Sequence, residues 1–227
     1  MFMGFFSFAN ALTLFGLISS LTSCFLAANG NVKFAVYMLF LATICEVFDK
    51  KLIPMTANQS PKHKQFAIQL TSICDLVSFG VTPCFIAFSF GFDGWFDVIV
   101  YCFYIICAAT RTAHFKALEI AFPNKKLNKN RGVPVTASTY ALTFLFLLTT
   151  FMPSAVSAWF FRLILIALAL AFVLNIRLKR PNIKQAAMAL GIELAVLLIL
   201  LVAGDCKAPE DQPVDNETSV ETSEVSQ

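Results

Sequence analysis

The chain alternates long apolar segments with short polar ones. Seven apolar segments fall roughly at residues 5–27, 32–48, 66–90, 95–118, 134–152, 154–176 and 183–204. Several of them approach ~20 residues, the length of helix that crosses the hydrocarbon core of a bilayer. Because lipid offers the backbone no hydrogen bonds, each segment is expected to be helical despite its β-branched and aromatic residues. The pattern therefore predicts an all-α integral membrane protein, with about seven transmembrane helices between residues 1 and 204.

Composition supports a membrane protein and leaves one segment outside the bundle. Hydrophobic residues make up 58% of the chain and charged residues only 14%, too little polar surface for a soluble domain of this size. Residues 205–227 carry seven acidic residues against the single Lys207, which predicts a disordered acidic tail. The seven cysteines form no C-x-x-C pair and indicate neither a disulfide framework nor a zinc site. The expected surroundings are membrane and lipid, not nucleic acid.

The basic residues predict how the chain is oriented. Lysine and arginine concentrate in residues 49–65, 111–131 and 177–184, which lie on one side if the seven segments alternate direction. The intervening connections are residues 28–33, 91–94 and 152–154, and their only basic residue is Lys33. Because basic loops stay in the cytoplasm, the N-terminus is expected to be cytoplasmic and the acidic tail to lie on the opposite side.

Acidic residues at the ends of two neighbouring segments are the candidates for chemistry. Glu46 and Asp49 share a helix face at the cytoplasmic end of the second segment, and Asp75 lies about ten residues into the third. Carboxylates that meet there would share protons or hold a hard cation. An alternative is that Asp75 bonds to backbone freed near Gly80 and Pro83. For Arg162 and Glu193, in later segments, we expect mutual pairing or outward snorkelling and no function.

The segment VFDKKLIPMTANQSPKHKQFAIQLTSICDLVSFGVTP resembles the active-site segment of the CDP-alcohol phosphatidyltransferases, especially bacterial phosphatidylserine synthases. The family pattern is D-x-x-D-G-x-x-A-R-x8-G-x3-D-x3-D, followed in the synthases by L-V-S-F-G-V-x-P. Four other stretches are similar to family segments and occur in the same order: ANALTLFGLISSLTSCFLAANGN, ATRTAHFKA, RGVPVTAS and FVLNIRLKRPNIK. The resemblance implies a bacterial inner-membrane homodimer that transfers a phosphatidyl group from CDP-diacylglycerol to an alcohol and releases CMP, with Mg²⁺ or Mn²⁺ as cofactor.

The resemblance also implies roles for individual residues, and several motif positions have changed. Asp49 matches the first aspartate, a metal ligand, and Asp75 matches the fourth, the general base. The other two aspartates and the two glycines of the motif are replaced, at Leu52, Thr71, Ile53 and Ala67. Losing carboxylate ligands argues against the two-metal reaction. Two hypotheses follow: a phosphatidyltransferase of phospholipid biosynthesis, or a catalytically inactive relative that binds lipid phosphate or a membrane partner.

Two further assignments keep an alternative each. Glu46 offers a substitute metal ligand, one helical turn before Asp49, or else faces the basic loop and pairs with Lys50. Arg111 and Lys116, in ATRTAHFKA, match a region that the resemblance implies lines a phosphate-binding cavity. Their alternative role is ordinary positive charge on the cytoplasmic side.

Overall fold

Helices account for nearly all of the regular structure in the computed structural model. The structure describes residues 7–52, 60–121, 129–131, 137–151, 154–174, 177–179 and 183–202. The predicted tail, residues 205–227, lies outside the described residues. The helices are α1 (Phe8–Ala28), α2 (Val32–Leu52), α3 (Pro61–Leu76), the π-helix η2 (Val77–Val81), α4 (Thr82–Ser89), α5 (Trp95–Ala121), α6 (Ala137–Phe151), α7 (Ser154–Val173) and α8 (Ile183–Val202).

The helices of the described residues follow the apolar segments closely. Because α3, η2 and α4 are consecutive, they form one rod, so each of the seven segments corresponds to one helical rod. The third rod begins at Pro61, not near residue 66 as predicted. Proline suits this first helical position because its fixed φ is close to the helical value and its missing N–H would have no partner there.

One feature departs from the all-α prediction. Strands β1 (Lys129–Arg131) and β2 (Arg177–Lys179) pair antiparallel, with Lys129 opposite Lys179 and Arg131 opposite Arg177. The first strand follows α5 and the second follows α7, so the pairing joins the α5–α6 connection to the α7–α8 connection. Two of the three basic segments therefore meet at one end of the bundle.

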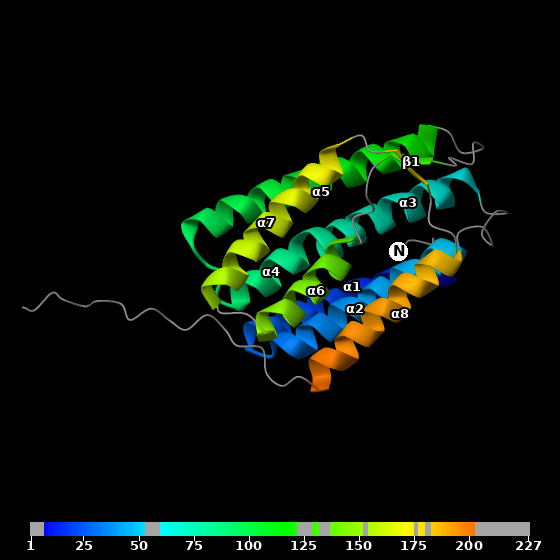
Figure 1. The fold of residues 1–227 in the computed structure, drawn as a ribbon. Helices are drawn as coiled ribbons and strands as arrows, with labels where there is room; N and C mark the ends of the chain where they lie inside the picture. The colour runs from blue at the N-terminus through cyan, green and yellow to red at the C-terminus, as the bar shows by residue number, and fades with distance from the viewer. Residues whose placement is uncertain are drawn as a thin grey trace, which may run out of the picture.

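The helix axes are roughly aligned (Figure 1). In this view α5 and α7 lie along one edge, α1, α2 and α8 lie along the other, and α3 and α4 lie between them. Helix α1 packs on α2, α5 packs on α7, and α3 packs on both α1 and α5. The close approach of α1 and α2 depends on Gly16, where an added Cβ would lie 3.2 Å from the Cβ of Cys45. The largest fully buried side chains include Tyr104, Phe79, Phe146, Phe161, Leu39 and Ile86.

The π-helix η2 interrupts the third rod directly after the turn that carries Asp75. Pro83 has no N–H, so the carbonyl of Phe79 lacks its usual helical donor four residues on. The hydroxyls of Tyr104 and Ser138 donate to this carbonyl over 2.8 and 3.0 Å. Side chains of α5 and α6 therefore supply the hydrogen bonds to the freed backbone carbonyl. Bonding to this freed backbone was the alternative role predicted for Asp75.

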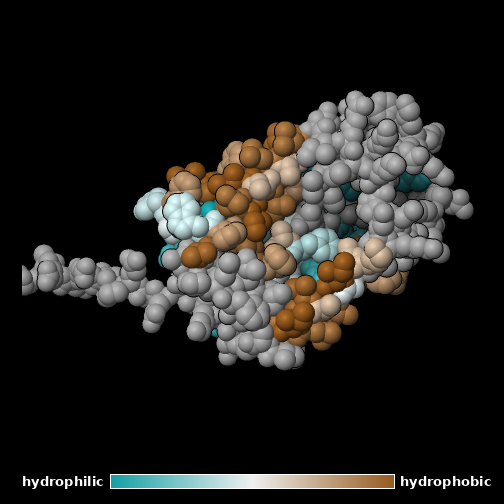
Figure 2. All heavy atoms as spheres, in the orientation of Figure 1, coloured by the Kyte–Doolittle hydropathy of each residue, from teal (hydrophilic) through white to brown (hydrophobic). Residues whose placement is uncertain are grey.

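The outer surface of the bundle is apolar and suits lipid. Large hydrophobic side chains on several helices are more than half exposed, among them Phe15, Ile99, Leu163 and Ile192. Figure 2 shows hydrophobic residues gathered over α5 and α7, and again over α8. In water such a surface would drive aggregation, so it is consistent with contact to acyl chains.

Three helices among the described residues are long and apolar enough to cross a bilayer. They are Phe8–Ala28, the rod Lys62–Ser89, and Trp95–Ala117; Trp159–Val173 and Met188–Leu200 are shorter apolar helices. Together with the apolar surface, these helices support an integral membrane protein. Seven crossings of the membrane remain a prediction.

Arg162 of α7 and Glu193 of α8 do not pair with each other. Arg162 instead forms a two-point ion pair with Asp97 of α5, over 2.5 and 2.8 Å. Glu193 is only 3% exposed and accepts a hydrogen bond of 3.3 Å from Thr143 of α6. The expected mutual pairing or outward snorkelling was therefore wrong, because α7 packs against α5 whereas α8 packs against α6.

Candidate functional site

A small cavity of about 20 Å³ lies between α1, α2 and the α3 rod and contains the predicted acidic residues. Glu46 and Asp49 reach it from α2, and Asp75 from α3. A volume of this size suits about one water molecule. The full lining is Thr13, Gly16, Leu17, Ala42, Cys45, Glu46, Asp49, Thr71, Cys74, Asp75, Ser78 and Phe79.

Asp49 is the most enclosed of the three carboxylates, at 2% exposure. The hydroxyl of Thr13, on α1, donates to its Oδ2 over 2.9 Å. The Thr71 hydroxyl lies 3.5 Å from the same oxygen, but its shorter bond, 2.9 Å, runs to the carbonyl of Ala67. Thr13 is therefore the principal hydroxyl donor to Asp49, and Thr71 stands beside this carboxylate as a neutral group.

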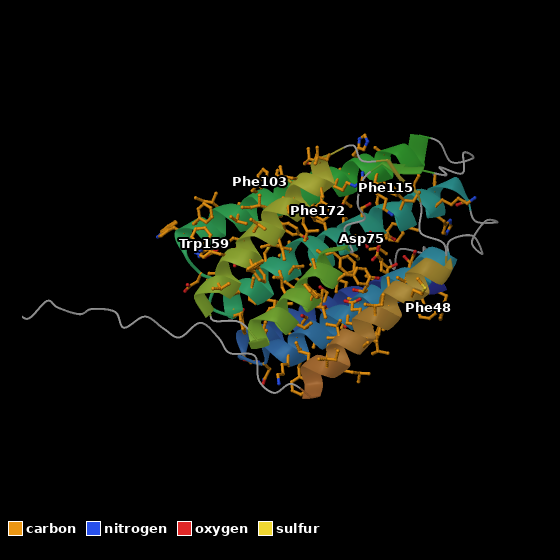
Figure 3. All side chains as sticks on the ribbon, viewed as in Figure 1. Phe48, Asp75, Phe103, Phe115, Trp159 and Phe172 are labelled. Carbon is orange, nitrogen blue, oxygen red and sulfur yellow. The ribbon has the colours of Figure 1, made fainter. Side chains whose placement is uncertain are left out.

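Asp75 and Glu46 share the cavity but differ in exposure. Asp75 is partly exposed, and Figure 3 places it inside the bundle, in the same half of the molecule as Phe48 and Phe115 and away from Trp159. Glu46 is 9% exposed and lines the cavity, so it does not extend freely into the basic loop. The Lys50 side chain, its alternative partner, lies outside the described part of the chain.

The changed motif positions are only partly described. Ala67 and Thr71 lie on consecutive turns of α3, joined by the hydrogen bond given above. Leu52 is the last residue of α2, but its side chain is outside the described atoms, and Ile53 is outside the described residues altogether.

The candidate phosphate-binding residues lie on α5. Arg111 is 7% exposed, and its guanidinium carbon lies 5.3 Å from the ring centre of Phe115. Lys116 is partly buried. The two basic residues therefore differ in burial: Arg111 is buried beside an aromatic ring, and Lys116 is only partly buried.

The side chains present do not fit the two-metal centre that the resemblance implies. Mg²⁺ requires near-octahedral oxygen ligation. Within the described part of the chain, no three or more His, Cys, Asp or Glu side chains are placed to hold a metal ion. The Oδ2 atom of Asp49 already accepts a hydrogen bond from the Thr13 hydroxyl.

Thr13 is the residue that the sequence analysis missed. It lies on the buried face of α1 with Asn10, Gly16 and Ser20, so polar and small residues recur at helical spacing in an otherwise apolar segment. That recurrence was visible in the sequence as a sign of a buried polar face. The recurrence did not indicate that the partner of Thr13 would be Asp49 of α2.

Two curated proteins are similar to this chain, and both are named CDP-diacylglycerol–serine O-phosphatidyltransferase. The Helicobacter pylori protein is 25% identical over 198 residues, which cover 85% of this chain and 79% of that protein. The Saccharomyces cerevisiae protein is 44% identical over 55 residues, 24% of this chain, and the match spans only 20% of the yeast protein. No family model matches the chain.

These similarities confirm the family resemblance seen in the motifs. The chain is a relative of the phosphatidylserine synthase-like CDP-alcohol phosphatidyltransferases.

Proposed function

We propose that this chain is a phosphatidylserine synthase-like membrane protein of phospholipid biosynthesis that binds CDP-diacylglycerol or phospholipid phosphate but does not catalyse the metal-dependent transfer. The observation that carries this proposal is the environment of Asp49. Its buried carboxylate is held by Thr13 at 2.9 Å, and the neighbouring motif position supplies only the hydroxyl of Thr71.

The expected loss of activity follows from the charges that the reaction needs. Phosphatidyl transfer requires the diphosphate charge to be neutralised and the reacting phosphorus to be polarised. A metal ion contributes several kcal/mol to such a step, so its loss lowers the rate by on the order of 10³-fold or more. Asp75 keeps the position of a general base, but a base by itself contributes only about 10²–10⁴-fold. Net turnover is therefore expected to be negligible.

Binding of a lipid phosphate has separate support in Arg111. Its guanidinium is largely enclosed and stacks near Phe115, which fixes the orientation of its planar fork of donors. Such a fork matches phosphate oxygens. We propose a bacterial inner-membrane protein that crosses the membrane seven times, with a cytoplasmic N-terminus, the site at the cytoplasmic interface, the acidic tail on the opposite side, and a homodimeric assembly.

Release of CMP from CDP-diacylglycerol by the purified full-length protein tests the catalytic part. The assay is run with Mg²⁺ or Mn²⁺, with and without L-serine, beside Asp75→Asn. We expect no release above this control. Binding of CDP-diacylglycerol to protein in lipid nanodiscs, compared with Arg111→Gln, tests the other part. Equal binding by the wild type and Arg111→Gln, or no binding by either, would overturn the proposed phosphate role.

A second function is favoured by one observation: Glu46, Asp49 and Asp75 line the same cavity. If Glu46 replaces a lost ligand, a reduced metal site still catalyses transfer. That function requires metal-dependent CMP release that disappears in both Glu46→Gln and Asp75→Asn. Such a result would replace the inactive relative with an active phosphatidyltransferase.

A further inference from the structure

Arg162 of α7 is held in one orientation at the surface of the bundle. Its Nε and Nη2 atoms donate to the two carboxylate oxygens of Asp97 over 2.5 and 2.8 Å. The Asp97 side chain is only 3% exposed, whereas the Arg162 side chain is 24% exposed. The guanidinium carbon also lies 5.2 Å from the ring centre of Trp159 and 5.9 Å from that of Phe96. The guanidinium is therefore fixed on one side and open to the surroundings on the other.

This ion pair lies where two membrane-crossing rods are joined. The rod Lys62–Ser89 ends, and the span Trp95–Ala117 begins, within a few residues of Asp97. The pair is therefore expected near the level of the lipid headgroups. Ile99 and Leu163, which follow on the same two helices, are 64% and 65% exposed. A lipid whose headgroup reaches the guanidinium can lay its acyl chains along the apolar surface of α5 and α7 (Figure 2).

The charges around Arg162 favour a zwitterionic ligand over an anion. Among the described residues, none accepts a hydrogen bond from the third nitrogen, Nη1, which carries two N–H groups. Gly94 lies against the ion pair, since an added Cβ would be 3.0 Å from Oδ2 of Asp97 and 3.9 Å from Nη2 of Arg162. The residue before it, Asp93, is exposed. With two acids and one arginine in this region, a phosphate joined to an ammonium group matches both signs of charge.

We propose that Arg162 and Asp93 bind the headgroup of a zwitterionic phospholipid. The lipid phosphate accepts hydrogen bonds from Nη1 of Arg162, and the ammonium group of the lipid donates to the carboxylate of Asp93. This site is separate from the candidate site, because Figure 3 shows Trp159 at the other end of the bundle from Phe48. The inference goes beyond the proposed function, since this lipid is held at the membrane surface and is not converted.

Tryptophan fluorescence measures binding at this place alone. The chain has two tryptophans, and Trp95→Phe leaves Trp159, beside Arg162, as the reporter. Delipidated full-length protein in detergent is titrated with phosphatidylethanolamine that carries bromine on its acyl chains near the glycerol. Phosphatidylglycerol with the same brominated chains has the phosphate but lacks the ammonium group. We expect half-quenching at a concentration about tenfold or more lower for phosphatidylethanolamine, because one charge-assisted hydrogen bond is gained.

Three variants in this background assign the contacts. Asp93→Asn is expected to abolish the preference for phosphatidylethanolamine over phosphatidylglycerol. Arg162→Gln/Asp97→Asn removes the phosphate contact without leaving a buried carboxylate unpaired, and should raise the half-quenching concentration of phosphatidylethanolamine about tenfold or more. Arg111→Gln, at the candidate site, should change neither value. If the double variant does not fold, Asp93→Asn decides, because it alters an exposed side chain.

Several results would overturn the inference. One is equal quenching by the two lipids, which identifies contact with acyl chains only. Another is a preference that survives in Asp93→Asn, or an unchanged affinity in the folded double variant. A loss of quenching in Arg111→Gln would place the lipid at the candidate site instead. Soluble phosphoethanolamine is added as a competitor, and displacement of the lipid at equal concentration would point to a free metabolite and not to a membrane lipid.

Discussion

The paired hydroxyls on the Phe79 carbonyl predict a non-additive loss of stability. Tyr104 and Ser138 donate to this oxygen over 2.8 and 3.0 Å, and all three residues are at most 2% exposed. Tyr104→Phe removes one donor with little change of shape, and Ser138→Ala removes the other. After either single change the carbonyl still has a partner, whereas after both it is buried without one.

The magnitudes follow from hydrogen bonds measured inside membrane proteins. A single bond there contributes about 0.6 kcal/mol on average and up to about 1.7 kcal/mol, so each single variant is expected to lose about 1 kcal/mol. Leaving a buried acceptor unsatisfied costs about 1–3 kcal/mol more. The double variant is therefore expected to lose about 3–5 kcal/mol. For a protein of this length, each kcal/mol lowers the Tm by about 2–4 °C.

Thermal unfolding of the four proteins in one detergent measures this non-additivity. Thr110→Ala serves as a matched control, because its exposed hydroxyl bonds to the Ile106 carbonyl of its own helix, and its loss should be close to zero. If the losses of Tyr104→Phe and Ser138→Ala simply add in the double variant, the two hydroxyls do not substitute for each other. That result would refute the account of how the helix tolerates Pro83.

Two further predictions concern the end of the bundle where α5 and α7 begin. Asp97→Asn is expected to lower the free energy of unfolding by about 2–4 kcal/mol, because Arg162 would lose the charge that it contacts at two points. Chemical unfolding in detergent measures this loss. A loss below ~1 kcal/mol would contradict the prediction and identify a weak surface pair. Trp95 and Trp159, the two tryptophans of the chain, are 89% and 66% exposed and are expected at the lipid–water interface. Lipids brominated near the headgroup should therefore quench their fluorescence more than lipids brominated near the bilayer centre, and the reverse order would contradict this placement.

The sequence by itself determined the helical rods and the family resemblance. In lipid, a long apolar segment has to satisfy its own backbone, so local pattern alone is enough to predict a helix. Each predicted segment accordingly matches a described rod. Asp49 and Asp75 were predicted to meet for a similarly local reason: a short connection makes α2 and α3 neighbours, and both residues do line one cavity.

Only the tertiary structure decided which side chains from distant segments meet. Nothing in the pattern of α1 indicated that Thr13 would donate to Asp49, or that Tyr104 and Ser138 would satisfy the carbonyl of Phe79. Arg162 pairs with Asp97 for the same reason. An apolar or polar face shows that a helix buries that face, but the partner depends on how each helix is rotated and which neighbour it packs against. Those choices are made by the packing of the whole bundle.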